Sequence, residues 1–353
     1  LIQDCQQGLK KYPDTIKVLD KLLKDLQENI LVLKKIISPS PTRLNIDNLQ
    51  DYENFKETYS SLIEKLALLG ITLSGHSEEN AELQKLFERS TELNIKFNSW
   101  LKKDNQNNIY WLEVFGRTIQ FNETPISIAE QFNKFQNKSD SAWIFTSATL
   151  SINGSFDHFT KLLGLEKAMT QYLQSPFNYS ENTFLYVPKE IPDPKDALFN
   201  LVLVKKVLPL IKASKGRAFI LATSLKSMEE IGALLKDELK KNKIGYPVIT
   251  QGEGPKSDLL QQFKQYGNAV LIGSLSFWEG IDVRGSALSL VIIDKLPFQS
   301  PGDPVFESKI KLLSDEGINA FISMQLPEAI IRLKQGVGRL IRDDHDKGVM
   351  VIC

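Results

Sequence analysis

Cysteine is almost absent from this sequence: Cys5 and Cys353 are the only two, and they lie at opposite ends of 353 residues. A pair so placed excludes a disulfide framework and offers no clustered thiolates for structural zinc. The sequence also lacks a run of eighteen apolar residues and a charged-then-apolar leader, so we expect neither a membrane span nor a secretory signal. These absences predict a cytoplasmic protein with no membrane partner.

Net charge is absent as well, because 43 lysines and arginines balance 43 aspartates and glutamates. The basic excess of many nucleic-acid-binding proteins is therefore missing. This balance does not exclude DNA, since a protein that follows one strand needs a basic groove rather than a basic surface. The three histidines match no metal-ligand spacing, and the acidic run 343–346 is typical of a solvated turn, so no metal site is expected.

The first hundred residues have the pattern of a helical module. Apolar residues recur at spacings of three and four from residue 14 to residue 38, which predicts one long helix with a single apolar seam. Asp14 is its expected N-cap, and the Ser-Pro-Ser-Pro run that follows predicts its end. Two further helices are expected, one from about 48 to 69 that ends at Gly70 and one from about 78 to 101.

After residue 108 the pattern changes to short strand-like runs, such as 109–114 and 142–146. Residues 175–196 contain four prolines and predict an extended connection between domains. Beyond it, continuous apolar runs alternate with helical stretches, which is typical of a parallel sheet covered by helices on both faces. The fold class is therefore α/β, with strands expected at 217–221, 269–272, 288–293 and 348–352.

The segment Gln335–Arg342, with the sequence QGVGRLIR, places two guanidinium groups three residues apart. In a helix this spacing puts Arg339 and Arg342 on one face. A transferring phosphoryl group spreads negative charge over its oxygens in the transition state and needs donors that keep their own charge. The pattern predicts a pair of phosphate-binding arginines, although two arginines by themselves are also typical of a solvated helix.

A glycine-containing loop, GSLSFWEGIDVRG, follows the strand expected at 269–272. Loops at the carboxyl ends of parallel strands are where such sheets bind ligands. Gly280 would let the backbone approach a phosphate or a ribose, and Asp282 could accept a hydrogen bond from a ribose hydroxyl or a reacting water. Phe277 and Trp278 offer stacking surfaces for bases, or they fill the core, which is the commoner place for aromatic residues after a buried strand.

These two segments resemble the fifth and sixth helicase motifs of the DinG/XPD-like helicases of superfamily 2, which contain the patterns SFWEG-D--G and QG-GRLIR. Further blocks agree in the same order. TSATL, from residue 146, resembles the third motif, LATS, from residue 221, the fourth, and LPF, from residue 296, the bacterial DinG branch. The resemblance covers residues 109–353, and the helices before it correspond to the arch insertion of the family.

The resemblance implies a role for each matching residue. Arg339 and Arg342 would contact the γ-phosphate of ATP, and Gln335 would point into the same cleft. Ser147 and Thr149 would couple the nucleotide state to the DNA contact, although serine and threonine near strand ends are also common in caps and turns. The residues implied in nucleotide binding are Glu279, Gly280 and Asp282, and those implied in DNA binding are Thr223, Ser224, Ser276 and Trp278.

The same resemblance implies three domains. A helical arch-like insertion would occupy residues 1–108. The end of a first RecA-like domain and a connection would follow at 109–175, and the second RecA-like motor domain of a helicase at 176–353. The expected architecture is thus an α/β fold with a RecA-like parallel sheet, preceded by an all-α insertion.

A P-loop of the pattern G-x-x-x-x-G-K-[ST] does not occur in these residues, and neither does an Asp-Glu-Ala-His box. The nearest approach has Pro255 in place of the second glycine and Thr250 in place of the first. ATP and Mg²⁺ would therefore be shared with a first RecA-like domain before residue 1, and this chain alone is expected to be inactive. The iron–sulfur cluster of several family members would also lie upstream. No cluster is expected in these residues, and they do not decide whether the full protein contains one.

The expected function is ATP-driven translocation on single-stranded DNA by a DNA helicase of DNA repair. One alternative is a DinG-type 3'-5' exonuclease whose helicase-like half binds DNA and is regulated by nucleotide. The other is a DNA-binding adaptor with an inactive motor fold. Intact Arg339 and Arg342 weigh against the adaptor, because an inactive motor has no need to neutralise charge in a transition state.

Overall fold

The computed structural model describes residues 1–8, 13–37, 43–75, 81–115, 118–138, 140–274, 277, 283, 287–343 and 345–353. They form two compact units. The helical unit consists of residues 1–128 and 300–318. The second unit, residues 129–299 and 319–353, is called the motor unit after the domain expected from the sequence. The chain therefore leaves the motor unit after residue 299 and returns to it at residue 319.

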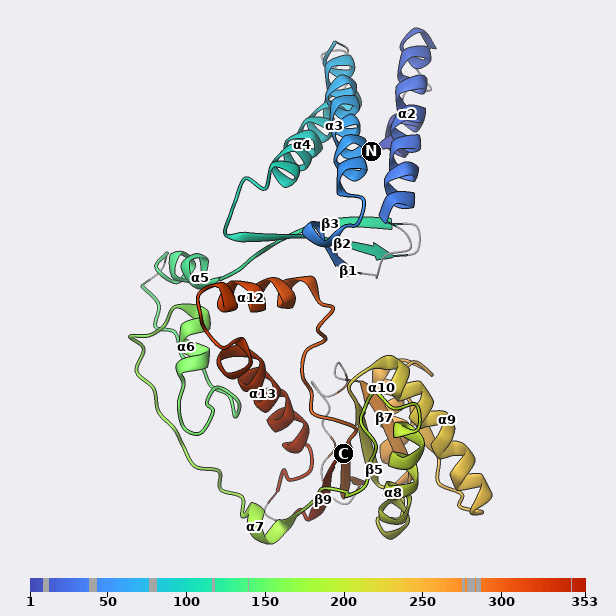
Figure 1. Cartoon of the computed structure of the whole chain (residues 1–353), viewed down its shortest axis with the longest axis vertical. Helices are drawn as coiled ribbons and strands as arrows, with labels where there is room; N and C mark the ends of the chain where they lie inside the picture. Colours follow the sequence, from blue (N-terminus) through green and yellow to red (C-terminus); the bar gives the residue numbers. More distant parts are fainter. Residues whose placement is uncertain are drawn as a thin grey trace. The chain divides into compact units, whose positions relative to one another are not determined.

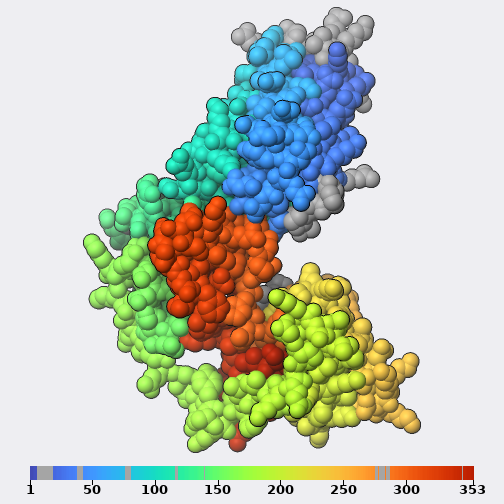
Figure 2. All heavy atoms as spheres, in the orientation of Figure 1, coloured from blue at the N-terminus to red at the C-terminus, as the bar shows by residue number. Residues whose placement is uncertain are grey.

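Three long helices lie side by side in the helical unit: α2 (Pro13–Ile37), α3 (Tyr52–Ser74) and α4 (Ala81–Lys102) (Figure 1). Figure 2 shows their side chains closely packed, in blue and cyan tones. The predicted long helix is confirmed, and seam residues such as Leu23 are fully buried. Its predicted N-cap is wrong, because Asp14 lies inside the first turn of α2.

Gly70 does not end α3, contrary to the prediction, and the helix continues to Ser74. Gly70 is buried against α4, where a Cβ atom would lie 3.3 Å from Ser90 Oγ. Glycine inside a helix costs about 1 kcal/mol relative to alanine. We attribute its presence to packing, since close contact between the two helices requires a small residue here.

A three-stranded antiparallel sheet covers the end of this bundle, in the order β1 (Arg43–Asn45), β2 (Asn108–Phe115) and β3 (Thr118–Pro125). The strand expected at 109–114 is therefore present, but it belongs to the helical unit. Aromatic side chains fill the space between sheet and helices, with ring centroids 5.1–6.4 Å apart: Phe55, Tyr59, Phe97, Trp100, Tyr110 and Phe121. The remaining elements of the unit are α1 (Ile2–Gly8), η2 (Ile46–Asn48) and α12 (Pro304–Asp315).

The motor unit is built on a six-stranded sheet in which every paired strand is parallel, in the order β4-β9-β8-β5-β7-β6. The apolar runs predicted as strands form the centre of this sheet, which confirms the α/β class. The strands at 218–222, 270–274 and 290–293 are entirely buried, as expected for a parallel sheet, whereas in the strand at 348–352 only Val351 is buried. The strands are β4 (Thr183–Tyr186), β5 (Ala218–Ala222), β6 (Val248–Thr250), β7 (Val270–Ser274), β8 (Leu290–Ile293) and β9 (Gly348–Ile352).

Helices cover both faces of the sheet, because successive strand residues point to opposite sides. Ile220 packs with α8 (Phe199–Ala213) and α9 (Leu225–Lys241), whereas Phe219 packs with α10 (Lys256–Tyr266) on the other face. Figure 1 shows α8, α9 and α10 around the sheet. The other helices of the unit are α5 (Ala129–Gln136), α6 (Asp157–Leu163), α7 (Tyr179–Asn182), η5 (Phe321–Gln325) and α13 (Leu326–Val337).

Two predictions for the residues before this sheet are wrong. Residues 142–146 form no strand, and Ile144 is 85% exposed. An apolar run becomes a strand only where a neighbouring strand can pair with it, and none of the described strands does so here. Residues 175–196 are not simply a connection, since they include β4, which pairs with β9. Among the described helices, none is long and apolar enough to cross a membrane.

Candidate functional site

The carboxyl ends of the parallel strands gather the polar side chains of the motor unit at one edge of the sheet. Thr223 and Ser224 follow β5, Asp294 follows β8, and Gln251 follows β6. Because all strands run the same way, these residues share that edge. The described residues therefore bring polar side chains together at the edge where ligand-binding loops were predicted.

Thr223 is held by the carboxylate of Asp294. Its backbone N–H donates to Asp294 Oδ1 at 3.0 Å, and its hydroxyl donates to Oδ2 at a longer 3.3 Å. A hydroxyl has a single proton to donate. Thr223 therefore cannot offer that proton to a DNA phosphate without breaking its hydrogen bond to Asp294 Oδ2.

Ser224 is exposed and is the N-cap of α9, where its Oγ accepts a hydrogen bond from Ser227 N at 3.2 Å. The capping role considered from the sequence is thus present. It uses Oγ only as an acceptor, so the hydroxyl proton remains to be donated to a phosphate. Of Thr223 and Ser224, Ser224 is the better placed donor.

Asp294 was not singled out from the sequence. Its side chain is fully buried, and Ser227 Oγ lies 3.0 Å from Oδ2. Burial raises the pKa of Asp294, whereas the charge of Lys295 and the hydrogen bonds from Ser227 and Thr223 lower it. The one signal in the sequence was an acidic residue directly after a continuous apolar strand, which is costly unless its oxygens are hydrogen-bonded.

Gln251 was also missed. Its Oε1 accepts hydrogen bonds from the backbone N–H of Ser274, at 2.7 Å, and from the Ser274 hydroxyl, at 2.8 Å. Ser274 is the last residue of β7, directly before the loop with the fifth-motif pattern. Gln251 therefore fixes the position at which that loop begins.

Most residues predicted on this loop lie outside the described residues: Ser276, Trp278, Glu279, Gly280 and Asp282. Phe277 is described and is only 4% exposed. The Lys256 ammonium lies 5.2 Å from the centre of its ring. Phe277 is therefore a core residue, the alternative to base stacking that the sequence left open.

The segment with the two arginines is not one helix, contrary to the prediction. Helix α13 ends at Val337, so Gln335 lies in its last turn, Arg339 lies in a turn and Arg342 in irregular structure. Glycines at 336 and 338 weaken the helix, since glycine loses the most backbone freedom when it becomes helical. The expected common helical face of the two arginines therefore does not form.

Arg339 and Arg342 are both partly buried rather than extended into solvent. Burial lowers the pKa of Arg342, and the nearby charge of Asp346 raises it. Asp346 also accepts backbone hydrogen bonds from Arg342, at 3.0 Å, and from Asp343, at 3.1 Å. No three potential metal ligands converge among the residues that the structure describes.

The two motifs pack on the same face of the sheet. Leu340 and Ile341, which stand between the arginines, belong to the same buried cluster as Phe277 and Val283. Leu340 lies beside Gly348, where β9 begins, because a Cβ atom on that glycine would be 2.4 Å from Leu340 Cδ1. Leu340 therefore packs against the start of β9, whereas Thr223 and Ser224 follow the carboxyl end of β5.

Ser147 and Thr149 contact each other, with their hydroxyl oxygens 3.1 Å apart, and Ser147 Oγ accepts a hydrogen bond from Thr149 N at 3.2 Å. Ser147 is exposed, and Thr149 is partly buried. This is local turn geometry, the alternative that the sequence left open for these hydroxyls.

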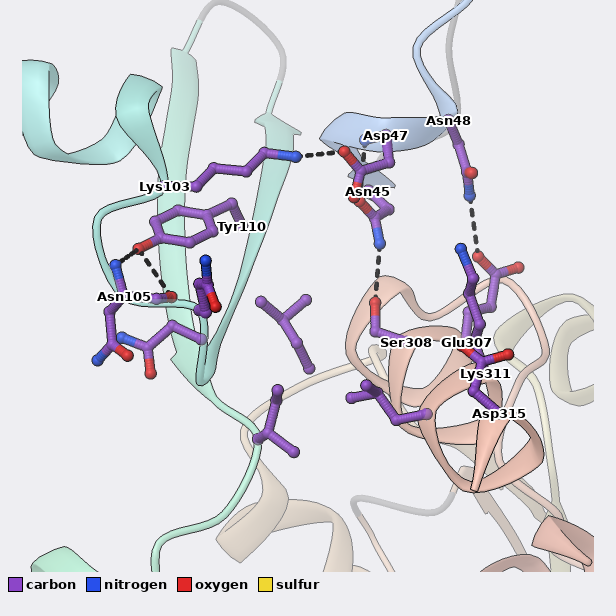
Figure 3. Close-up of a pocket in the computed structure, with 15 residues that line it drawn as sticks. Asn45, Asp47, Asn48, Lys103, Asn105, Tyr110, Glu307, Ser308, Lys311 and Asp315 are labelled. Atoms are coloured by element: carbon purple, nitrogen blue, oxygen red, sulfur yellow. Dashed lines mark hydrogen bonds and ion pairs between the residues drawn. The ribbon is translucent and has the colours of Figure 1, made fainter. Parts of the chain in front are cut away.

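A separate pocket of about 400 Å³ lies inside the helical unit, between the small sheet and α12 (Figure 3). Asn45 Nδ2 donates to Ser308 Oγ at 2.7 Å, and Lys103 pairs with Asp47. None of the predicted site residues lines it. Its lining has three carboxylates and two ammonium groups, which does not favour a phosphate: Asp47, Glu307, Asp315, Lys103 and Lys311.

The fold and this arrangement define a class. A parallel sheet covered on both faces, with hydroxyl residues at its carboxyl edge and partly buried arginines after its last described helix, has the α/β arrangement of a RecA-like domain. Residues 207–353 match the family model described as a helicase C-terminal domain. The chain belongs to the DinG/XPD-like helicases of superfamily 2, as a C-terminal region.

Relatives of known name agree with this family. The ATP-dependent DNA helicase YoaA of Haemophilus influenzae is 40% identical over 338 residues, which are 95% of this chain and 51% of the relative. The YoaA of Escherichia coli is 44% identical over 275 residues, 78% of this chain and 42% of the relative. The chain thus spans about half of the length of the curated relatives that it matches.

Solved structures show the same fold. An XPD helicase is similar with a TM-score of 0.57 and 16% identity, over 99% of this chain and 60% of that one. Xpd4 of S. tokodaii has a TM-score of 0.55 and 12% identity, over 94% of this chain and 66% of that one. The 3'-5' exonuclease DinG of Bacillus subtilis is also a relative, 33% identical over 232 residues, 64% of this chain and 24% of that protein.

Proposed function

We propose that this chain is part of an ATP-dependent DNA helicase that translocates on single-stranded DNA in DNA repair. In this proposal residues 176–353 form the second RecA-like domain, residues 109–175 are the end of the first RecA-like domain and a connection, and residues 1–108 are the arch-like insertion. The observation on which it depends most is the match of residues 207–353 to a helicase C-terminal domain, together with the similarity to two helicases named YoaA. ATP hydrolysis would drive closure of two RecA-like domains and so change the contact with the strand.

In the proposed site, Arg339 and Arg342 contact the γ-phosphate of ATP. Their partial burial supports this role, because a charge–phosphate interaction strengthens as water is excluded. Gln335 would orient within the same cleft, and Glu279, Gly280 and Asp282 would line its nucleotide side. Guanidinium groups remain charged at all working pH values, so they fit the oxygens of a phosphate.

Mg²⁺ has no set of ligands among the described residues. We therefore assign its ligands, and the P-loop that would hold the β- and γ-phosphates, to a first RecA-like domain outside this sequence. The exposed run 141–148 would pack against that domain; Ile144, 85% exposed, is the residue with the most to gain from burial. Ser147 and Thr149 lie in the same run and would couple the two domains.

DNA would contact the carboxyl edge of the sheet. Ser224 would donate its hydroxyl proton to a backbone phosphate, with Thr223 beside it, and Ser276 and Trp278 would complete the contact from the adjacent loop. Contacts of this kind to the backbone carry no sequence information. The proposed substrate is therefore single-stranded DNA of any sequence.

Strand displacement and DNA degradation, measured side by side on the full-length protein, test the proposal. We expect ATP-dependent displacement of an annealed strand and no shortening of either strand. Degradation without displacement would instead support the exonuclease alternative, which the name of the Bacillus subtilis relative favours. ATP turnover by the chain of residues 1–353 alone, stimulated by DNA, would contradict the assignment of the P-loop to another domain.

A further inference from the structure

The segment 294–299 connects the carboxyl edge of the sheet, at Thr223, to helix α13. The proposed function assigns the first to DNA and the end of the second to nucleotide. The segment begins at Asp294, whose carboxylate holds Thr223 at the carboxyl edge of the sheet. It ends at Gln299, which contacts Arg332 on α13. Gln335 lies one turn further along the same helix, and the turn with Arg339 follows directly. These six residues therefore join the DNA-contacting residues to the helix that leads to the nucleotide-contacting ones.

Arg332 makes three hydrogen bonds at this junction. Its Nη1 donates to the carbonyl oxygen of Pro297 at 3.3 Å, and its Nη2 donates to Gln299 Oε1 at 3.2 Å. The third, at 3.4 Å, runs to Glu328 Oε2 one turn earlier on α13, and this ion pair orients the guanidinium. A planar guanidinium can contact several acceptors at fixed angles, which a single ammonium cannot do.

The segment is also stiff. Pro297 is buried and has a fixed φ angle. The backbone N–H of Phe298 donates to the carbonyl of Leu296 at 2.8 Å, which closes a three-residue turn. The ring of Phe298 packs on that of Phe321 in η5, with centroids 5.7 Å apart. A displacement of α13 would therefore move the whole segment rather than be absorbed within it.

At the other end of the segment, hydrogen bonds hold Asp294 to the sheet. Its backbone N–H donates to the carbonyl of Leu221, the penultimate residue of β5, at 3.1 Å. Its Oδ2 also meets Ser227 in the first turn of α9, and Ser227 in turn contacts Asn200 of α8 at 3.1 Å. Ser224 is the N-cap of the same α9. A shift of Asp294 would therefore alter both the Thr223 backbone and the start of the helix that Ser224 caps.

We propose that Asp294 and Arg332 are positioning residues that couple nucleotide binding at the end of α13 to DNA binding at Thr223 and Ser224. This inference depends on the proposed function for its two ligands. Neither residue contacts nucleotide or DNA in it. Arg332 transmits the position of α13 to the 294–299 segment, and Asp294 transmits the position of the segment to Thr223. A helix of twelve residues is about 18 Å long, so α13 can transmit a displacement over that length as a rigid element.

The test is the thermodynamic linkage between the two ligands in the full-length protein. The affinity for fluorescein-labelled oligothymidylate is measured by anisotropy, without nucleotide and with saturating Mg²⁺–AMP-PNP. The ratio of the two dissociation constants is the coupling factor, and effectors commonly change it by about 5-fold to 150-fold. A loss of stability alone lowers the active fraction in both measurements and leaves this ratio unchanged.

Arg332→Met keeps the length of the side chain and removes every donor. We expect its coupling factor to fall to about 1, with the nucleotide-free affinity for oligothymidylate within about twofold of wild type. Arg332→Lys restores the positive charge on a single donor nitrogen and should give an intermediate factor. Arg89→Met is the matched control, because Arg89 is an exposed arginine of the helical unit with an ion pair to Asp4.

Asp294→Asn should lower the coupling factor as well. Its amide nitrogen donates hydrogen bonds where Oδ2 accepts them from the hydroxyls of Thr223 and Ser227. Combined with Arg332→Met it should cause no further loss, because both residues act through one segment. A wild-type coupling factor in Arg332→Met, additive effects in the double variant, or a factor of 1 in the wild type would each overturn the inference. A wild type that shows linkage but no strand displacement overturns the proposed helicase function and leaves this coupling in place.

Discussion

The carboxylate of Asp294 and the backbone N–H of Thr223 lie 3.0 Å apart, although the two residues are 71 positions apart in the sequence. The contact joins the ends of the adjacent strands β8 and β5. It shows how a parallel sheet places residues from distant segments at one edge. The following predictions start from this edge and from the turn after α13.

Replacement of Arg339 or Arg342 by lysine should impair ATP turnover in the full-length protein. A lysine keeps the charge but cannot contact two phosphate oxygens in a fixed plane. Arginines that stabilise the transition state of phosphoryl transfer contribute about 10³-fold or more to the rate. We expect a fall of at least about a hundredfold in DNA-stimulated kcat, measured at saturating DNA.

The affinity of these two variants for single-stranded DNA should stay within about twofold of wild type, since neither arginine is assigned to the DNA contact. Arg89→Lys, in the helical unit, is the control for an exposed arginine. Wild-type turnover in both Arg339→Lys and Arg342→Lys would contradict their assignment to the phosphate.

Ser224 allows capping to be separated from DNA binding. Aspartate caps a helix as well as serine does, so Ser224→Asp should retain stability, but its negative charge should weaken DNA binding by about tenfold or more through repulsion of the phosphate. Ser224→Ala should lose about 1 kcal/mol of the free energy of unfolding, because the cap is removed. Chemical denaturation and anisotropy with labelled DNA measure the two effects. Normal DNA binding by Ser224→Asp would remove this residue from the proposed interface.

Asp294 predicts a pH dependence of stability. Its pKa is raised in the folded protein by burial, so the folded state binds more protons than the unfolded state between the ordinary pKa of 3.8 and the raised value. The stability contributed by this residue is therefore present below the ordinary pKa and decreases as the pH rises through the raised one. Asp294→Asn does not titrate and lacks this decrease.

The free energy of unfolding of Asp294→Asn, relative to wild type, should thus shift in favour of the variant from about pH 4 to about pH 7. Urea denaturation at several pH values measures this difference. A difference that is constant with pH, or that shifts in favour of the wild type, would show that the carboxyl is not held at a raised pKa.

Tyr59 is the largest fully buried side chain of the helical unit, and its hydroxyl has no hydrogen-bond partner in the part of the chain that the structure describes. A buried polar group without a partner costs about 1–3 kcal/mol. Tyr59→Phe should therefore raise the free energy of unfolding by about 1 kcal/mol. Tyr110→Phe is the matched control, because its hydroxyl lies 3.1 Å from Glu123 and also bonds to Asn105. It should lower stability, and equal effects of the two changes would contradict the prediction.

The sequence by itself determined the parts of this protein that depend on local pattern. A helix seam repeats every three or four residues and a buried strand is continuously apolar, so α2 and the central strands of the sheet could be predicted from the composition of their own segments. The motif patterns that place the chain among DinG/XPD-like helicases are also local. They are recognised from consecutive residues, without the positions of neighbouring segments.

Only the tertiary structure decided the rest, because each remaining feature depends on a neighbour that is distant in sequence. Gly70 stays helical because α4 packs against it, and the run 142–146 forms no strand because no described strand pairs with it. The role of Asp294 follows only from the pairing of β8 with β5, which brings its carboxylate within hydrogen-bond distance of Thr223. Burial and hydrogen bonding are properties of such contacts, and the order of residues along the chain does not contain them.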